Sequence, residues 1–238
     1  MANGPRLRVL TYNVHGQRDD RAALAAVVRG LAPDVAVLQE APRRFRWRTR
    51  CADLAHRLDM VYAGGGEPAV GNVVFTSLRV RAHEQWCLRF PLTPGRHLRG
   101  AVFVRCSVGR SPFVVAGSHL GLDPAERAGQ AVILKKVLAD LDAPVVLGLD
   151  VNDHDGSPPW RTVADGLVDA GRGGEPTFPV WRPQHRIDAI LVDPRCTVLD
   201  YGVVDTPEAR AASDHLPVFV DIELWTNGGS EGKDAPGE

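Results

Sequence analysis

Polar side chains that could bind a metal or transfer a proton lie next to apolar, strand-like runs at six places in the sequence. They are Asn13, Glu40, His119, the pair Asp150 and Asn152, Asp188, and the pair Asp214 and His215. Carboxylates buried at strand ends cost free energy unless a cation or hydrogen bonds compensate them. Several carboxylates that converge repel one another unless a metal lies between them. Oxygen-rich ligands suit Mg²⁺ or Mn²⁺ better than zinc, so the pattern predicts a site for one of these ions.

Each position also has a purely structural interpretation. Asn13 fits a turn residue that caps its own backbone. Glu40 fits a solvated acid at a helix N-terminus, Asp150–Asp153 fits a polar turn, and Ser213–His215 fits a turn with a surface histidine. Such coincidences at five strand ends are much rarer than one shared site. The set therefore favours a single catalytic centre.

Apolar periodicity predicts the elements that position these residues. Strands are expected at 6–14, 35–38, 72–76, 80–88, 101–106, 113–117, 144–149, 186–192, 197–204 and 217–224, with helices at 19–31, 47–58, 124–141 and 157–167. Residues 64–66, three glycines, are expected to form a loop. This order predicts an α/β (α+β) fold with two stacked mixed sheets and helices outside. We expect one domain over residues 1–225 and a disordered tail over 226–238.

Composition excludes several classes of protein. Of 238 residues, 44% are hydrophobic and 24% charged, with a formal net charge of -1, so no global field attracts nucleic acid or anionic membranes. We expect a cytoplasmic monomer without stable membrane association, because no signal peptide or membrane-length apolar run is present. The four cysteines are scattered and expected to be reduced, with a disulfide between Cys87 and Cys106 as the alternative.

Six motifs resemble those of the endonuclease/exonuclease/phosphatase superfamily, and they occur in family order. They are Leu10-Thr11-Tyr12-Asn13-Val14-His15-Gly16, Leu38-Gln39-Glu40, Ser118-His119-Leu120, Asp150-Val151-Asn152, Arg186-Ile187-Asp188-Ala189-Ile190-Leu191 and Ser213-Asp214-His215-Leu216-Pro217. The superfamily includes DNase I, exonuclease III-type abasic-site endonucleases, sphingomyelinases and inositol polyphosphate 5-phosphatases. The resemblance extends from Leu7 to about Leu224 and implies a four-layered α/β/β/α sandwich of the DNase I type.

The same resemblance implies a role for each site residue. Glu40 is the main metal ligand with Asn13, and Asp214 completes the shell directly or through water. Asp150 positions or deprotonates the attacking water, Asn152 holds the scissile phosphate or the nucleophile, Asp188 bonds His215, and His215 and His119 contact phosphate oxygens. In-line attack on a phosphodiester needs such an oriented nucleophile and neutralised oxygens.

Two positions depart from the family pattern. Many members carry Gly-Asp-x-Asn, whereas here Gly148 lies one residue further back, before Leu149 and Asp150. His15 stands where abasic-site endonucleases usually carry an aspartate, which weakens an assignment to DNA repair and leaves the general chemistry unaffected.

Basic and aromatic residues near these motifs are candidates for substrate recognition. Residues 43–50, with five arginines, fit a rim that follows phosphates and stacks bases, or alternatively the solvated face of a helix with Trp47 in the core. Arg99 and Arg186 are expected to bind substrate. Thr177-Phe178-Pro179 and Trp181 fit a loop over the site or a packing role.

Three functions remain open from the sequence. The leading hypothesis is a metal-dependent phosphodiesterase or nuclease. Its substrate would be a phosphate ester, and nucleic acid is one candidate. The alternative is a phosphomonoesterase or a lipid or inositol phosphate phosphoesterase on the same scaffold. An inactive binding scaffold is disfavoured, because Asp150, Asn152 and His215 are all present.

Overall fold

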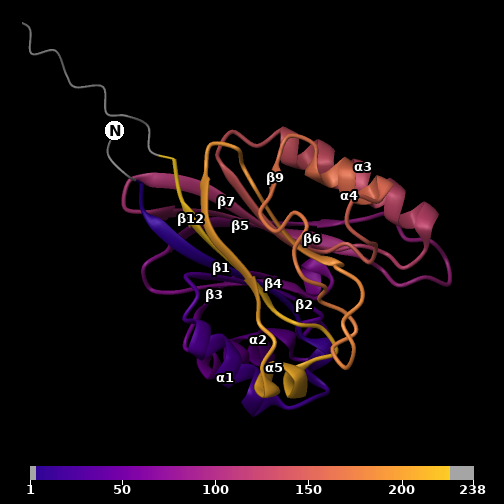
Figure 1. The fold of residues 1–238 in the computed structure, drawn as a ribbon, viewed down its shortest axis with the longest axis horizontal. Helices are drawn as coiled ribbons and strands as arrows, with labels where there is room; N and C mark the ends of the chain where they lie inside the picture. The colour runs from indigo at the N-terminus through magenta and orange to yellow at the C-terminus, as the bar shows by residue number, and fades with distance from the viewer. Residues whose placement is uncertain (1–3, 226–238) are drawn as a thin grey trace, which may run out of the picture.

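Two six-stranded sheets form the centre of the molecule in the computed structural model, which describes residues 4–225 (Figure 1). The first sheet has the order β11 (Thr197–Val203), β12 (Val218–Glu223), β1 (Arg6–Asn13), β2 (Val35–Gln39), β4 (Asn72–Thr76) and β3 (Val61–Gly66). The second has the order β5 (Arg81–Arg89), β6 (Gly100–Val108), β7 (Ser111–His119), β8 (Val145–Asp150), β10 (Asp188–Val192) and β9 (Val168–Asp169). Both sheets are mixed, as predicted. The predicted tail over 226–238 lies outside the described residues.

Helices cover the outer face of each sheet. The first sheet carries α1 (Arg21–Leu31), α2 (Trp47–Arg57) and the short α5 (Pro207–Ala212), whereas α3 (Pro124–Ala139) and α4 (Pro158–Ala164) lie over the second (Figure 1). Three apolar clusters separate the layers, one between the sheets and one beneath each set of helices. The four-layered α/β/β/α sandwich predicted from the sequence is thereby confirmed.

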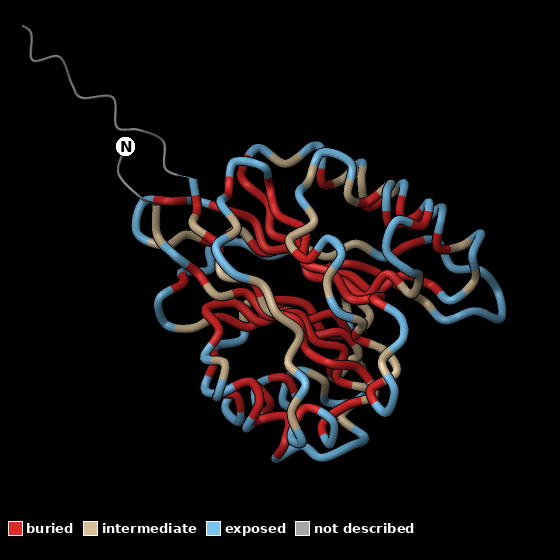
Figure 2. The backbone as a smooth tube through the Cα atoms, viewed as in Figure 1, coloured by how far each residue is buried: buried red, intermediate tan, exposed pale blue. Residues whose placement is uncertain are grey.

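Strands near the centre of each sheet are buried on both faces (Figure 2). In β2, Val35 and Val37 point between the sheets, while Ala36 and Leu38 point toward the helices. Successive side chains of such a strand point to opposite faces, and here both faces are buried and apolar. The strand therefore appears in the sequence as a continuous apolar run. The backbone of a strand buried on both faces is held firmly up to its last residue. Several site residues occupy such strand ends.

The sheets approach one another closely at two glycines. A Cβ added to Gly117 of β7 would lie 2.5 Å from Val37 Cγ1, and one added to Gly148 of β8 would lie 2.9 Å from Thr11 Oγ1. No larger residue fits either position without displacing these side chains of the facing sheet. The displaced glycine of the Gly148-Leu149-Asp150 motif therefore serves the spacing between the two sheets.

We expect Gly117→Ala to lower the free energy of unfolding by about 1–3 kcal/mol, because its methyl group would overlap two β-branched valines, Val37 and Val102. Urea denaturation of both proteins measures the change. Gly129→Ala in α3 is the control: its added Cβ meets nothing within 4 Å, so the protein should be unchanged or up to ~1 kcal/mol more stable. Equal stability of Gly117→Ala and wild type would contradict this close approach.

Some predicted elements were wrong. Residues 64–66 form part of β3 and pair with β4, because a partner strand supplies hydrogen bonds that local glycine propensity does not reveal. The strand predicted from Arg186 begins at Asp188, and the six-residue helix α5 and the two-residue strand β9 were not predicted. Such short elements depend on tertiary contacts more than on periodicity.

All four cysteines are free thiols. Cys87 of β5 pairs in register with Val102, whereas Cys106 faces Ala82, so the alternative of a Cys87–Cys106 disulfide is wrong. Among the helices of residues 4–225, none has the length and apolar character needed to cross a membrane.

Candidate active site

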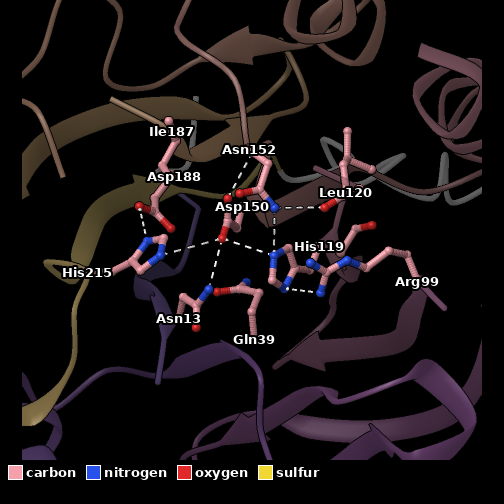
Figure 3. A network of polar contacts seen from close by, with 12 residues as sticks. Asn13, Gln39, Arg99, His119, Leu120, Asp150, Asn152, Ile187, Asp188 and His215 are labelled. Atoms are coloured by element: carbon pink, nitrogen blue, oxygen red, sulfur yellow. Dashed lines mark hydrogen bonds and ion pairs between the residues drawn. The ribbon is translucent and has the colours of Figure 1, made fainter. Parts of the chain in front are cut away.

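Three predicted site residues lie in one row across neighbouring strands of the second sheet. His119 ends β7 and pairs in parallel register with Asp150, which ends β8. Asp188 begins β10 and pairs in antiparallel register with the same Asp150. The three side chains therefore meet at one edge of the sheet, and Asp150 is fully buried between the other two (Figure 3).

The first sheet contributes Asn13 to the same centre. Asn13 ends β1, and its Nδ2 donates a hydrogen bond of 2.9 Å to Asp150 Oδ2 across the gap between the sheets. Ser213 Oγ donates to the backbone carbonyl of Asn13 at 2.6 Å and so connects the Asp214-His215 segment to β1. The site is thus built from both sheets and depends on their spacing.

Asp188 and His215 form the predicted hydrogen bond. Oδ2 of Asp188 lies 2.9 Å from His215 Nδ1 and also accepts from Thr177 Oγ1 at 2.6 Å. The opposite nitrogen, Nε2, lies 3.9 Å from Asp150 Oδ2. Burial alone lowers the pKa of His215, but the charge and hydrogen bond of Asp188 and the charges of Asp150 and Asp214 together raise it to about 10. His215 is therefore a cation at neutral pH that presents Nε2–H to the site.

We expect Asp188→Asn to lower the pKa of His215 from about 10, because the nearest stabilising charge and its hydrogen bond to Nδ1 are lost. A histidine whose folded pKa exceeds its unfolded value of about 6.5 stabilises the fold below pH 6.5 and loses that contribution as pH rises toward 10. The variant should lose this contribution at lower pH than the wild type. NMR titration of the imidazole nitrogens measures both midpoints, with His83, which bonds Ser107 outside the site, as the internal reference. An unchanged His215 midpoint would contradict the pairing.

His119 is held neutral beside the same carboxylate. Arg99 Nη1 lies 3.1 Å from His119 Nδ1, and a guanidinium can only donate, so Nδ1 accepts this bond and Nε2 is the nitrogen that faces Asp150. That nitrogen lies 3.3 Å from Asp150 Oδ2. Burial lowers the pKa of His119 to about 3 despite the opposing effect of Asp150, and the charge of Arg99 adds to this lowering. The two histidines therefore carry different charges on either side of Asp150.

Asn152 completes this side of the site from a strained backbone position. Its φ is 56°, in the left-handed region that asparagine tolerates better than most residues, and its backbone N–H donates to Asp150 Oδ1 at 2.9 Å. The side-chain Nδ2 donates to the Leu120 carbonyl at 2.8 Å and lies 2.8 Å from His119 Nε2 (Figure 3). Asn152 thus holds Asp150 through its backbone N–H and contacts His119 through its side-chain amide.

Arg99 is a buried cation that no carboxylate neutralises at ion-pair distance. Its side chain is 8% exposed, and within residues 4–225 it forms no ion pair and its Nε has no hydrogen-bond partner. Burial lowers its pKa, which the more distant charges of Asp150 and Glu40 oppose. A buried charge in this state is costly, so the position favours an anionic ligand.

Two of the predicted metal ligands, Glu40 and Asp214, are more exposed than the buried residues around Asp150. Glu40 directly follows β2, is only partly buried, and makes no hydrogen bond or ion pair with any residue between 4 and 225. Asp214 is also partly exposed, with Oδ1 4.0 Å from His215 Nε2. Carboxylate and amide oxygens from Glu40, Asp214 and Asn13 make a donor set that fits a hard divalent cation.

A second group could also accept a cation. Ligand atoms of Asp150, Asp188 and His215 lie within 4.8 Å of one another. The 2.9 Å bond between Asp188 and His215 Nδ1 places a proton between these two groups, which favours a hydrogen-bonded pair over metal ligation. The Glu40 carboxylate, by contrast, has no hydrogen-bond or ion-pair partner among residues 4–225.

Arg186, predicted to bind substrate, is not brought into the centre. Its guanidinium forms a double hydrogen bond with Asp169 at 2.5 and 2.9 Å and stacks 4.7 Å from the Trp160 ring centroid. These contacts satisfy its charge within the protein. The motif Arg186-Ile187-Asp188 therefore combines one structural residue with one site residue.

Several residues that support the site were not assigned from the sequence. Thr177 orients Asp188, Ser213 fixes Asn13, and the Phe178 ring lies 4.8 Å from the His215 ring. The loop prediction at Thr177-Phe178-Pro179 indicated their proximity. The individual contacts join residues far apart in sequence, and no local signal identifies them.

Sequence comparison assigns the chain to a family. Residues 10–215 match the Endonuclease/Exonuclease/phosphatase family, so the chain belongs to this family, whose members are phosphoester hydrolases. This confirms the resemblance seen in the sequence motifs. Comparison with curated proteins gives no match for this chain.

Solved structures share the fold. An endonuclease/exonuclease/phosphatase from Beutenbergia cavernae matches with a TM-score of 0.70 and 27% identity, covering 92% of this chain and 72% of that one. A mannosyl-6-phosphatase from Bacteroides thetaiotaomicron matches at 0.75 and 19% identity, covering 91% and 99%. D. rerio TDP2 complexed with a single-strand DNA product matches at 0.69 and 19% identity, covering 91% and 98%. The fold thus occurs with different phosphate-ester chemistry.

Proposed function

We propose that this protein is a Mg²⁺- or Mn²⁺-dependent phosphodiesterase that cleaves its substrate by in-line attack of water. The observation that carries the proposal is Arg99, a buried guanidinium with no carboxylate at ion-pair distance in residues 4–225. It stands beside a neutral histidine, His119, and across Asp150 from a cationic one, His215. A phosphate bound there would receive hydrogen bonds from all three groups.

The chemical step follows from the charges around Asp150. Its carboxylate is the acceptor for one proton of water while the water oxygen bonds to phosphorus and the ester P–O bond breaks. His215 Nε2–H and Arg99 donate to the phosphoryl oxygens, where negative charge develops in the transition state. Asn13 and Asn152 hold the two oxygens of Asp150 and so fix the direction from which water attacks.

The metal belongs at Glu40, Asn13 and Asp214. When bound, Mg²⁺ or Mn²⁺ supplies positive charge that stabilises phosphoryl and leaving oxygens. The half-buried, unpartnered carboxylate of Glu40 supports this placement. Asp188 acts through His215, since it holds the ring orientation and its charged form.

A substrate panel tests the proposal. The protein is assayed with bis(p-nitrophenyl) phosphate, p-nitrophenyl phosphate, plasmid DNA, an abasic-site duplex and sphingomyelin, in Mg²⁺ or Mn²⁺ and in EDTA. Hydrolysis of a diester that stops in EDTA is the expected result. Cleavage of the monoester alone would show that the protein is a phosphomonoesterase and not a phosphodiesterase. Cleavage that continues in EDTA would overturn the metal-dependent mechanism.

We expect Arg99→Met to lower kcat/KM for bis(p-nitrophenyl) phosphate by about 10²-fold, because one preorganised donor to the phosphoryl group is lost. Methionine keeps most of the side-chain volume and removes the buried charge. Steady-state kinetics measure the loss, and thermal unfolding should show a protein at least as stable as wild type. Arg186→Met is a comparison at another buried arginine: it should lower stability, because Asp169 is left unpaired. Retention of full activity in Arg99→Met would contradict the phosphate site.

Compartment and assembly are proposed from separate observations. The four free thiols fit a reducing cytoplasm. We propose a monomer whose substrate contacts all come from this chain, since the site draws on both sheets of one molecule.

A further inference from the structure

A second cationic region borders the site and is unused by the proposed mechanism. A pocket of about 250 Å³ is lined by Glu40, Arg18, Arg43, Arg44 and Arg50, and neutral residues form the rest of its wall. We call this the cationic pocket. Four arginines surround it, and Glu40 is its sole acidic lining residue. Because Glu40 is also the proposed main metal ligand, the pocket and the site share a wall.

These four arginines have no acidic partners in the described part of the chain. Within residues 4–225, Arg18, Arg43, Arg44 and Arg50 form no ion pair, although eleven other arginines do. Arg43 is the best fixed, since its Nη1 donates to the Val70 carbonyl at 3.3 Å. The protein has a net charge of -1, so this concentration of unpaired cations is local. It favours an anion.

Arg43 also connects the pocket electrostatically with the centre. Its charge lowers the pKa values of both Arg99 and His119. The geometry agrees: Arg43 donates to the Val70 carbonyl, and a Cβ added to Gly100, the residue after Arg99, would lie 3.3 Å from Val70 Cγ2. A substrate that places one phosphate at Arg99 and extends past Glu40 therefore enters the cationic pocket.

Phe45 is an exposed aromatic residue next to the four arginines of the cationic pocket. Phe45 is 87% exposed and lies between Arg44 and Arg46, just before α2 begins at Trp47. Trp47, the neighbouring aromatic, is half-buried beneath Arg48, whose guanidinium lies 4.4 Å from its ring centroid. Phe45 thus contributes little to packing and offers a free face on which a flat ring can stack.

We propose that the cationic pocket is a second phosphate subsite, which binds a phosphate neighbouring the scissile one in a single-stranded polynucleotide, while Phe45 stacks on a base. This inference rests on the proposed phosphodiesterase function. Unpaired arginines that follow a backbone, alternating with an aromatic that accepts any base, are the features by which proteins bind single strands. A small polyphosphate would use the arginines and leave Phe45 without a role.

Binding tests the subsite without catalysis. Fluorescein-labelled (dT)12 is titrated with the full-length protein in EDTA, at several salt concentrations, and anisotropy gives Kd. Arg44→Ala/Arg50→Ala should raise Kd at least about tenfold and reduce the slope of log K against log[salt] by about 1.4, since each single-strand phosphate contact contributes about 0.7. Phe45→Ala should raise Kd at least about fivefold without changing that slope, because stacking displaces few ions.

The matched control removes two charges elsewhere. Arg81 and Arg110 are exposed, make no ion pair in the described chain, and lie at the opposite end of β5–β7 from His119. Arg81→Ala/Arg110→Ala should bind (dT)12 within twofold of wild type. If both double variants weaken (dT)12 binding equally, the loss of affinity comes from the loss of positive charge in general. That result would overturn the subsite. If Phe45→Ala binds normally and inositol hexakisphosphate displaces (dT)12 stoichiometrically, the occupant is a small polyanion and the polynucleotide inference fails.

Kinetics separate failure of the subsite from failure of the proposed function. Thymidine 5′-(p-nitrophenyl phosphate) has one phosphate, whereas an oligonucleotide also occupies the pocket. Arg44→Ala/Arg50→Ala should lose at least tenfold more kcat/KM on the oligonucleotide than on the small diester. Equal losses, with an active wild type, would overturn the subsite alone. A wild type that binds (dT)12 through these arginines and cleaves neither compound would overturn the proposed function alone.

Discussion

Asp150→Asn should lower kcat for a phosphodiester by about 10³-fold while leaving the fold intact. The substitution keeps the shape of the side chain and an oxygen that can accept from the Asn152 N–H. It removes the charge and the ability to take a proton from water, and positioned bases contribute about 10²–10⁴-fold to rate. It also removes one of the charges that raise the pKa of His215. Both changes act on the same transition state.

Asp140→Asn provides the comparison for this variant. Asp140 follows α3, is exposed, and forms no ion pair within residues 4–225. Its kcat should equal that of wild type. Single-turnover measurement at saturating metal isolates the chemical step, and a melting temperature near wild type excludes global damage. An Asp150→Asn enzyme within tenfold of wild type would assign proton transfer to another group.

Removal of divalent metal should lower activity by at least about 10³-fold, because a bound cation supplies several kcal/mol of charge stabilisation in the transition state. Addition of Mg²⁺ or Mn²⁺ should restore it fully. Circular dichroism should be the same in EDTA as in Mg²⁺, since the apolar clusters on either side of both sheets do not involve the proposed ligands.

Glu40→Gln identifies the ligand behind this dependence. It should raise the Mg²⁺ concentration for half-maximal activity at least about tenfold, because a neutral amide replaces a carboxylate that has no partner among residues 4–225. Glu175→Gln, at an exposed position without an ion pair in the described chain, should leave that concentration unchanged. A metal requirement unaltered by Glu40→Gln would place the cation elsewhere, with the Asp150, Asp188 and His215 group as the next position to test.

Much of the centre was predictable because strands with two buried faces produce continuous apolar runs. Asn13, His119 and Asp150 all directly end such runs, and Asp188 begins one. The pairing register of the strands then brings these residues together, because His119 and Asp188 both pair with Asp150. Motif order supplied the topology that periodicity alone leaves undetermined.

The unpredicted parts depend on contacts between distant residues. Arg186 belongs to a site motif, yet Asp169 satisfies its charge, and Asp169 lies in a two-residue strand that leaves no periodic signal. Thr177 reaches Asp188 through a loop whose path the sequence does not specify. The glycines of β3 extend a sheet only because β4 provides partners. In each case tertiary structure overrides local propensity.

The buried Asn13–Asp150 hydrogen bond joins the two sheets within the site. Thermal denaturation can therefore be used to search for the natural substrate. A ligand that contacts both sheets binds the folded protein and not the unfolded chain, so it stabilises by RT ln(1 + [L]/Kd), or about 2.7 kcal/mol at a hundredfold excess over Kd. A library of phosphate esters can then be ranked by the rise in melting temperature with the catalytic carboxylate neutralised. Because the readout is binding, such a screen ranks compounds whichever of their bonds the active enzyme cleaves.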